Sequence, residues 1–479
     1  MGARAFRCAR RDSARRRRSS ARATCSTPRS RTVPTPSPPP VPATYVPEAP
    51  ATYVVSAFEG GESIGVFIEG DKRRKTPWVS QDFLGLGAEP SVVAAAKEAI
   101  NTYTVGSCGP RGFYGTTSAH LDLEKSLALF LRAEEAITYS DATATVVSVI
   151  PAFVKKGDVL LIDSGANWAI QQGAWLSRSK VVWWAHNDVA DLEAKLAAVA
   201  EADVRRPGSA ATQRRFIIVE GLYASSGALC PLPAVVALAK RYRWRIVLDD
   251  SLAFGVLGEK GRGTVEEARV APEDVHVTVG SLATTLGSVG GFCVGSRDIV
   301  DHQRLSGAGY CFSASAPPFL SALAGAALAE IEARPARVAA LDARARGLHA
   351  RLTGAGLGSA LRLVSDARSP VKHFVLADAR APVAPEPAAA RMLSPTSQKV
   401  PAVSAADAAV RAREEATLDE IIRRCATAAD GVLLARTHTL AGEPFPARPA
   451  LKIALTLRHS VEDEVRLVAL LKRVVDEVI

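Results

Sequence analysis

The chain has 479 residues, which is too many for one small core and predicts a globular protein of two domains. Hydrophobic residues make up 48% of it and charged residues 23%, as in ordinary soluble proteins. The net charge of +10 lies within residues 1–32, which hold eleven Arg and one Asp, so the rest of the chain balances 48 basic against 48 acidic residues. This distribution argues against a basic nucleic-acid-binding face.

Residues 1–50 form a leader of low complexity. It contains the basic run Arg15 to Arg18 and the run Pro38-Pro39-Pro40, and it is nearly free of acidic residues. Such a segment buries too little apolar surface to order itself. Its composition is typical of an organelle transit peptide, but a disordered leader or a misplaced gene start explains it equally well. Residues 51–89 then form an N-terminal arm.

Six short apolar runs rich in β-branched residues follow, and helical patterns such as Asp188–Ala200 and Pro231–Tyr242 separate several of them. Continuous apolar strands that alternate with helices indicate an α/β fold with a mostly parallel sheet covered on both faces. We assign residues 90–315 to this large domain. Its expected strands are Val159–Asp163, Val181–His186, Arg215–Leu222, Arg245–Asp250, Val275–Leu282 and Gly291–Gly295.

Residues 316–479 predict a smaller C-terminal α+β domain. A long Ala/Leu/Arg-rich helical stretch covers 319–353, and Ser460–Ile479 is an amphipathic helix with Ser460 as its N-cap. Strands are expected at Leu361–Val364, His373–Ala377 and Leu451–Leu457, and the Ala/Pro-rich residues 379–403 are expected to form a flexible insertion. The uncharged stretch from Leu305 to Ala329 contains Pro317-Pro318, which favours a loop followed by a buried helix over a membrane span.

The seven cysteines are scattered, with no C-x-x-C pair, and the eight histidines show no ligand spacing. This pattern predicts a reducing compartment and no metal site. The cysteines are Cys8, Cys25, Cys108, Cys230, Cys293, Cys311 and Cys425.

Three glycine-rich or acidic segments could carry chemistry. Residues 108–116 are dense in Gly and could form a backbone nest for an anion, but they lack the Lys-Ser/Thr of a nucleotide P-loop. Residues 255–263 follow a strand without opening an apolar helix, which disfavours a nicotinamide site. Asp249 and Asp250 end a predicted strand, where sites of α/β proteins form, although such a pair is often a simple loop start.

Together these segments resemble the α-oxoamine synthase family of fold-type I pyridoxal-phosphate (PLP) transferases over about residues 75–479. The resemblance is carried by Cys108 to Thr116 with His120 to Glu124, and by Phe216–Tyr223, Ser251–Gly263 and Asp301–Pro318. It implies a fold in which a Lys forms a Schiff base with PLP, an Asp holds the pyridinium nitrogen, a His stacks on the ring and a helix N-terminus binds the phosphate. An amino acid then condenses with an acyl-CoA.

Several residues at these implied positions depart from the family pattern. The Schiff-base Lys falls at Thr284, the stacking His at Trp168, which follows Asn167, and the His of the Asp-Glu-Ala-His motif at Leu252. The phosphate turn Ser-Gly-Phe becomes Asp141-Ala142-Thr143, while the pyridinium Asp is kept as Asp249.

These departures predict a chain that has no catalytic residue of its own. A hydroxyl cannot form an imine, so Thr284 supplies neither a covalent anchor nor a base. A carboxylate at Asp141 would stand where the phosphate binds, and two charges about 4 Å apart repel by ~4 kcal/mol at an effective dielectric near 20. The resemblance therefore implies a non-catalytic subunit whose lysine-bearing partner holds PLP covalently.

Active sites of this fold type lie at a dimer interface, so the resemblance also implies roles toward the partner. Ser313 is expected to reach the phosphate in the partner's site, and Asp249 and Asn167 are the remaining cofactor-binding positions. The residues expected to line the interface and substrate entrance are Cys108, Gly109, Arg111, Phe113 and Tyr114.

Two other functions stay open on the sequence. An independent enzyme would need another amine, for which Lys260 and Arg297 lack a supporting motif, and a non-enzymatic scaffold could bind lipid or protein. The resemblance implies an endoplasmic reticulum membrane complex on its cytosolic face, reached through other subunits, whereas the transit-like leader would direct the chain to an organelle.

Overall fold

A computed structural model describes residues 55–58, 64–205, 207–377, 405–438, 440, 443 and 445–479. The predicted leader at 1–50 and the predicted insertion at 379–403 lie outside the described residues.

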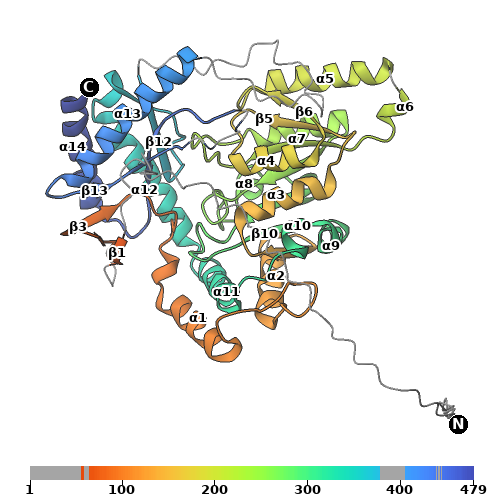
Figure 1. Cartoon of the computed structure of the whole chain (residues 1–479), viewed down its shortest axis with the longest axis horizontal. Coiled ribbons are helices and arrows are strands. Elements are labelled where there is room, and N and C mark those ends of the chain that lie inside the picture. The colour runs from red at the N-terminus through yellow and green to blue at the C-terminus, as the bar shows by residue number, and fades with distance from the viewer. Residues whose placement is uncertain are drawn as a thin grey trace, which may run out of the picture. The chain divides into compact units, whose positions relative to one another are not determined.

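The large part of the fold is built on a seven-stranded sheet of order β4-β10-β9-β8-β7-β5-β6 (Figure 1). Strands β5 to β9 pair in parallel, and β10 runs antiparallel to both of its neighbours, β9 and β4. The strands are β4 Glu135–Tyr139, β5 Val159–Asp163, β6 Lys180–Trp184, β7 Arg215–Glu220, β8 Arg245–Asp249, β9 Val277–Ser281 and β10 Gly291–Gly295.

Both faces of this sheet are buried because successive side chains of a strand point to opposite faces. On β5, Leu160 and Ile162 pack with α3 and α4, whereas Val159 and Leu161 pack with α5 and α7. The helices of this part are α1 Pro90–Tyr103, α2 Ser118–Leu131, α3 Ala142–Phe153, α4 Trp168–Ser177, α5 Val189–Arg205, α6 Pro207–Ala210, α7 Leu232–Tyr242, α8 Thr264–Glu267, α9 Arg297–Ser306, α10 Ala308–Cys311 and α11 Pro318–Ala333.

The C-terminal part holds a four-stranded sheet of order β11-β12-β15-β14, with helices α12, α13 and α14 beside it (Figure 1). A second four-stranded sheet joins β1, β2 and β3 to β13, so the N-terminal arm pairs with the C-terminal part of the chain. The elements are β1 Val55–Phe58, β2 Val66–Ile68, β3 Asp71–Pro77, α12 Ala336–Gly354, β11 Leu361–Leu363, β12 Val371–Leu376, α13 Ala405–Thr427, β13 Val432–Leu433, β14 Ala435–Arg436, β15 Leu451–Ala454 and α14 Val461–Val478. Three short 3-10 helices cover Leu86–Ala88, Pro272–Asp274 and Leu357–Ser359.

Most predicted elements appear with nearly the expected bounds, and the predicted N-cap Ser460 accepts a hydrogen bond from the backbone of Asp463. Several features differ from the expectation, among them the short strands β1, β2, β3, β13 and β14, which were not predicted. The predicted helix over 319–353 is two helices that break at Arg334 and Pro335, because proline cannot continue the backbone hydrogen bonds of a helix interior. Strand β4 was not predicted, since its five residues begin with a glutamate and carry a weak apolar pattern.

Within the part of the chain that the structure describes, no helix combines the length and the apolar character needed to cross a membrane.

Candidate functional site

The retained Asp249 lies at the carboxyl end of β8, near the middle of the parallel strands. Its Oδ2 accepts a hydrogen bond from Asn167 Nδ2 at 2.9 Å, and its Oδ1 accepts one from the backbone N–H of Ser251 at 3.0 Å. Asn167 comes from the loop between β5 and α4 and caps α4 through the N–H of Ile170. The fold therefore brings the two predicted cofactor-binding residues, Asp249 and Asn167, into direct contact.

A second buried carboxylate, Glu220, stands beside Asp249. The two residues are register partners at the ends of the adjacent strands β7 and β8. Glu220 accepts hydrogen bonds from the backbone N–H groups of Asn167, at 2.6 Å, and Ala224, at 3.0 Å. Burial, reinforced by the charge of Asp249, raises the pKa of Glu220 to about 8, and burial also raises the pKa of Asp249. Both shifts favour the protonated form of a carboxyl group over the charged form.

Thr284 lies in the loop between β9 and β10, close to the same strand ends. Its hydroxyl donates a hydrogen bond to the backbone carbonyl of Ser251 at 2.8 Å. The loop is tight at Gly287, where φ is +63° and an added Cβ would meet the backbone of Gly87 at 2.9 Å. Thr284 is thus held next to the residue that hydrogen-bonds Asp249.

The N-terminus of α3 is capped by the chain itself. The Asp141 carboxylate accepts a hydrogen bond from the N–H of Ala144 at 2.7 Å, and the hydroxyl of Thr145 donates to the backbone carbonyl of Asp141 at 2.8 Å. This side chain occupies the position at which a helix N-terminus would otherwise attract an external anion.

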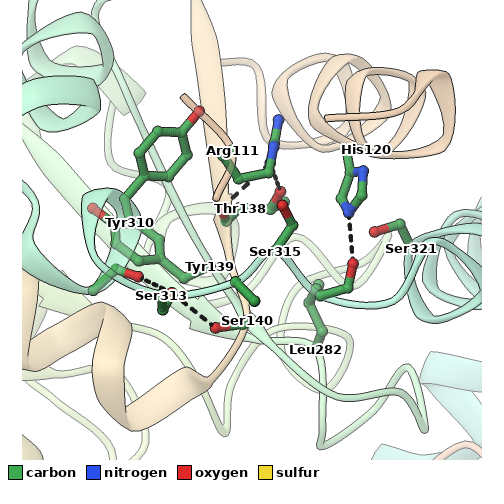
Figure 2. A pocket seen from close by; sticks show the side chains of 13 residues that line it. Arg111, His120, Thr138, Tyr139, Ser140, Leu282, Tyr310, Ser313, Ser315 and Ser321 are labelled. Carbon is green, nitrogen blue, oxygen red and sulfur yellow. Dashed lines mark hydrogen bonds between the residues drawn. The ribbon is translucent and has the colours of Figure 1, made fainter. Parts of the chain in front are cut away.

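Ser313 lies beside that helix terminus. Its hydroxyl donates to the carbonyl of Gly309 at 2.5 Å and lies 3.4 Å from the hydroxyl of Ser140 (Figure 2). Both serines line a pocket with Arg111, His120, Thr138, Tyr139, Leu282, Gly309, Tyr310, Ala314, Ser315, Ala316 and Ser321. The pocket joins the loop at 108–116 to the segment at 309–316.

Arg111 anchors the glycine-rich loop from inside. Its guanidinium pairs with both carboxylate oxygens of Glu124, at 2.8 and 3.0 Å, and donates to the Thr138 hydroxyl at 2.7 Å. The neighbouring carbonyl of Gly109 accepts hydrogen bonds from the N–H and the hydroxyl of Ser315. Arg111 and Gly109 therefore differ from their neighbours in being buried and in holding the loop onto α2, β4 and the 309–316 segment.

The tip of this loop is apolar and open to solvent. Phe113 and Tyr114 are 79% and 75% exposed, Cys108 is exposed, and Phe312 in the adjacent segment is 88% exposed. Aromatic side chains at such exposure are common in surfaces that bind another protein.

The residues present fit a PLP group only in part. Asp249 and Asn167 could hold a pyridinium nitrogen, but Thr284 offers no amine for an imine and Asp141 presents a negative charge at the helix terminus. Trp168 opens α4 with its indole N–H buried and without a hydrogen-bond partner among the described residues. Leu252 is buried in the apolar core and has no polar atom to offer. We therefore derive no chemical step through PLP in this chain.

Sequence reasoning did not identify Glu220 as a site residue. In the sequence, Glu220 ends an otherwise apolar run, Phe216 to Val219. That pattern indicates a buried carboxylate, but it does not show that Asp249 lies beside it. Among the described residues, the two other basic residues considered, Lys260 and Arg297, form no ion pair with Asp249 or Glu220. Arg297 begins α9, beyond the end of β10 that is farther from Thr284, and pairs with Glu135. Lys260 is exposed in the loop after β8.

The sheet order and the residues at its strand ends are those of a PLP-dependent transferase fold. Comparison with known proteins supports this fold class. Residues 73–362 match the family described as aminotransferase class I and II. A solved serine palmitoyltransferase from Sphingomonas wittichii aligns over 90% of this chain and 93% of its own, with a TM-score of 0.73 at 24% identity, a likeness that shows the fold.

The chain belongs to the aminotransferase class I and II family. A Dictyostelium discoideum protein named serine palmitoyltransferase 1 is 34% identical over 413 residues, which are 86% of this chain and 80% of the relative. An Arabidopsis thaliana protein named long chain base biosynthesis protein 1 is 42% identical over 54% of this chain, and that match spans 53% of the relative's own length. The predicted resemblance and fold class are confirmed.

Proposed function

We propose that this chain is the non-catalytic subunit of a serine palmitoyltransferase, which condenses L-serine with palmitoyl-CoA to 3-ketosphinganine in sphingolipid biosynthesis. In this proposal a homologous lysine-bearing subunit forms a heterodimer with it and binds PLP covalently. The names of the relatives from Dictyostelium discoideum and Arabidopsis thaliana support the pathway. The division of labour rests on this chain's own residues.

The observation that carries the proposal is the state of the residues around Asp249. In this proposal Thr284 stands at the lysine position, and its hydroxyl donates a hydrogen bond to the Ser251 carbonyl. The helix terminus for a phosphate is already capped by Asp141. Two changes with independent physical effects, the lost imine and the added charge, both disfavour covalent PLP in this chain.

The transferase fold of this chain would still contribute to catalysis if the chain completes its partner's active site. The exposed tip made by Cys108, Phe113 and Tyr114, with Phe312 beside it, supplies apolar surface for an interface. Ser313 follows Phe312 in the chain and is half-buried. In the proposed heterodimer Ser313 approaches the phosphate of the partner's PLP, and the tip borders the entrance for serine and acyl-CoA.

We further propose that the heterodimer works at the endoplasmic reticulum membrane, on its cytosolic face, and reaches the membrane through other members of the complex. An organelle entered through the leader at residues 1–50 is the alternative. The distinguishing measurement is the mature N-terminus together with fractionation of the full chain from its native cells.

The test is reconstitution with a lysine-bearing homologue. We expect the chain alone to give no visible absorbance of a PLP imine and no product from serine and palmitoyl-CoA. The pair should form a heterodimer with more activity than the lysine-bearing subunit alone. An imine on the isolated chain, or a pair no more active than the catalytic subunit, would refute the proposal, and the latter result would favour a scaffold that binds lipid or protein.

Two variants examine the shared site directly. Ser313→Ala should lower the activity of the pair, and Cys108→Trp should alter activity or the choice of amino acid, because both changes lie at the proposed entrance. Val204→Trp is the matched control, since Val204 is 83% exposed on α5, away from the 108–116 loop. Equal activity and amino-acid choice in all three variants would contradict a shared site.

A further inference from the structure

Outside the Asp249 site, a serine, a histidine and an aspartate form a continuous hydrogen-bonded line. The Nδ1 atom of His186 lies 2.8 Å from Asp163 Oδ1, and its Nε2 atom lies 3.2 Å from Ser226 Oγ. The Asp163 side chain is fully buried, whereas that of His186 is 31% exposed. This is the arrangement in which a histidine withdraws the proton of a nucleophilic hydroxyl.

The topology of the sheet explains how the three residues meet. Asp163 is the last residue of β5, His186 follows β6, and Ser226 follows β7, and these three strands are neighbours in the order β7-β5-β6. The carboxyl ends of parallel strands share one edge, where α/β proteins place their reacting groups. The line lies beside the Asp249 site on that edge, because Ser225 Oγ donates to Gly165 O in the loop that leads to Asn167.

The surrounding hydrogen bonds fix the direction of proton transfer. Asp163 also accepts from the Tyr223 hydroxyl at 2.9 Å and from the N–H of Asn187 at 2.9 Å, which holds its carboxylate in place. A carboxylate facing Nδ1 selects the tautomer with a proton on Nδ1, which leaves the lone pair of Nε2 facing Ser226. Ser226 Oγ accepts from the N–H of Ala228 at 3.3 Å and remains able to donate its own proton to Nε2.

The turn that carries the serine is held rigidly. The Ser226 carbonyl accepts from the Ser365 hydroxyl at 2.9 Å, and the Gly227 carbonyl accepts from the N–H of Asp366 at 3.0 Å. The N–H of Ser226 itself donates to none of the residues that the structure describes. A backbone N–H next to the nucleophile is the kind of donor that stabilises an oxyanion.

We propose that Ser226, His186 and Asp163 form a nucleophilic triad that hydrolyses activated acyl groups, namely esters or thioesters. Ser226 Oγ bonds to the acyl carbon while its proton moves to His186 Nε2, and the C–O or C–S bond then breaks as the alcohol or thiol leaves with that proton. Water attacks the acyl-serine in the same way, gives its proton to Nε2, and the acid departs as the proton returns to Oγ. Ser226 and His186 are the catalytic residues, and Asp163 positions His186.

This activity does not depend on the proposed heterodimer, so its test uses the full chain by itself. A fluorophosphonate probe with a fluorescent tag should label the chain, and peptide mapping should place the label on Ser226. Ser226→Ala and His186→Gln should reduce both labelling and hydrolysis of p-nitrophenyl butyrate at least about a hundredfold. Ser225→Ala is the matched control, because it removes the adjacent hydroxyl, and it should keep both signals.

Thermal melting of every variant separates loss of chemistry from loss of fold. Asp163→Asn should lower kcat while leaving KM unchanged, as expected for a residue that acts through His186. Absence of labelling on the folded chain, a label on another residue, or equal hydrolysis by the Ser226→Ala variant would each overturn the proposal.

Discussion

The hydroxyl of Thr284 donates a hydrogen bond to the backbone carbonyl of Ser251, 2.8 Å away, and the N–H of Ser251 in turn donates to Asp249. The side chain at the position where the resemblance predicts a lysine is thereby linked, through Ser251, to the Asp249 carboxylate.

Thr284→Lys combined with Asp141→Ser should allow the chain to form an imine with PLP. Thr284→Lys alone supplies the amine, but the Asp141 carboxylate still opposes the phosphate. Removal of a charge about 4 Å away should tighten binding at least about tenfold, because such repulsion amounts to several kcal/mol. Titration with PLP, followed by visible absorbance, measures this difference. Thr284→Met, which has a similar length and no amine, is the control, and an equal absorbance in the Met and Lys variants would contradict the prediction.

Asp141→Ala should lower the free energy of unfolding by about 1 kcal/mol, the usual cost of a lost helix N-cap. The reason is that Ala144 loses the acceptor for its N–H at the start of α3. Asp141→Ser should stay within a few tenths of a kcal/mol of the wild type, because serine is also a good cap. Urea denaturation measures both, and equal losses in the two variants would show that the cap is not the cause.

Arg111→Met should destabilise the chain by about 3 kcal/mol, because it leaves Glu124 buried without its partner. Adding Glu124→Leu should recover part of this loss, since the double variant buries no unpaired charge. A double-mutant cycle from denaturation curves gives the coupling between the two residues. Additive losses would mean that the pair does not stabilise the loop as a unit.

Glu220 should make the chain less stable as the pH rises. Its pKa is about 8 when folded and near 4.5 when unfolded, so the folded state binds more protons between these values. The contribution of this group is therefore fully present below about pH 4.5 and is lost as the pH rises through about 8. Glu220→Gln should remove this part of the pH dependence while keeping an oxygen acceptor for a backbone N–H. Denaturation of both proteins from pH 5 to pH 9 measures the difference, and parallel curves would rule it out.

Phe312→Asp should weaken the proposed heterodimer by about 10- to 100-fold in Kd, the usual loss for a central aromatic residue of an interface. Val461→Asp, at an exposed apolar position at the start of α14, should leave association unchanged. Analytical ultracentrifugation with the lysine-bearing partner measures both. If the two variants bind the partner equally well, the surface around Phe312 is not the interface.

The sequence predicted the α/β class and several strands almost to the residue, because burial on both faces requires continuous apolar runs such as Val159–Asp163. It did not predict the break at Pro335 within a continuous Ala/Leu pattern, nor β4, whose assignment depends on its pairing with β10. It placed Phe113, Tyr114 and Arg111 together at an interface and substrate entrance, which stays a prediction. The structure separates them by burial, since Phe113 and Tyr114 are exposed and Arg111 is buried.

The inability of Thr284 itself to form an imine was determined by the sequence alone, because imine formation depends on the identity of one side chain. The tertiary structure decided which groups stand near one another: Glu220 beside Asp249, and Ser226 in line with His186 and Asp163. These contacts join residues 23 to 40 positions apart in the chain. They follow from the order of the strands in the sheet. That order depends on which strands pair with one another in the folded chain, and no local sequence pattern specifies it.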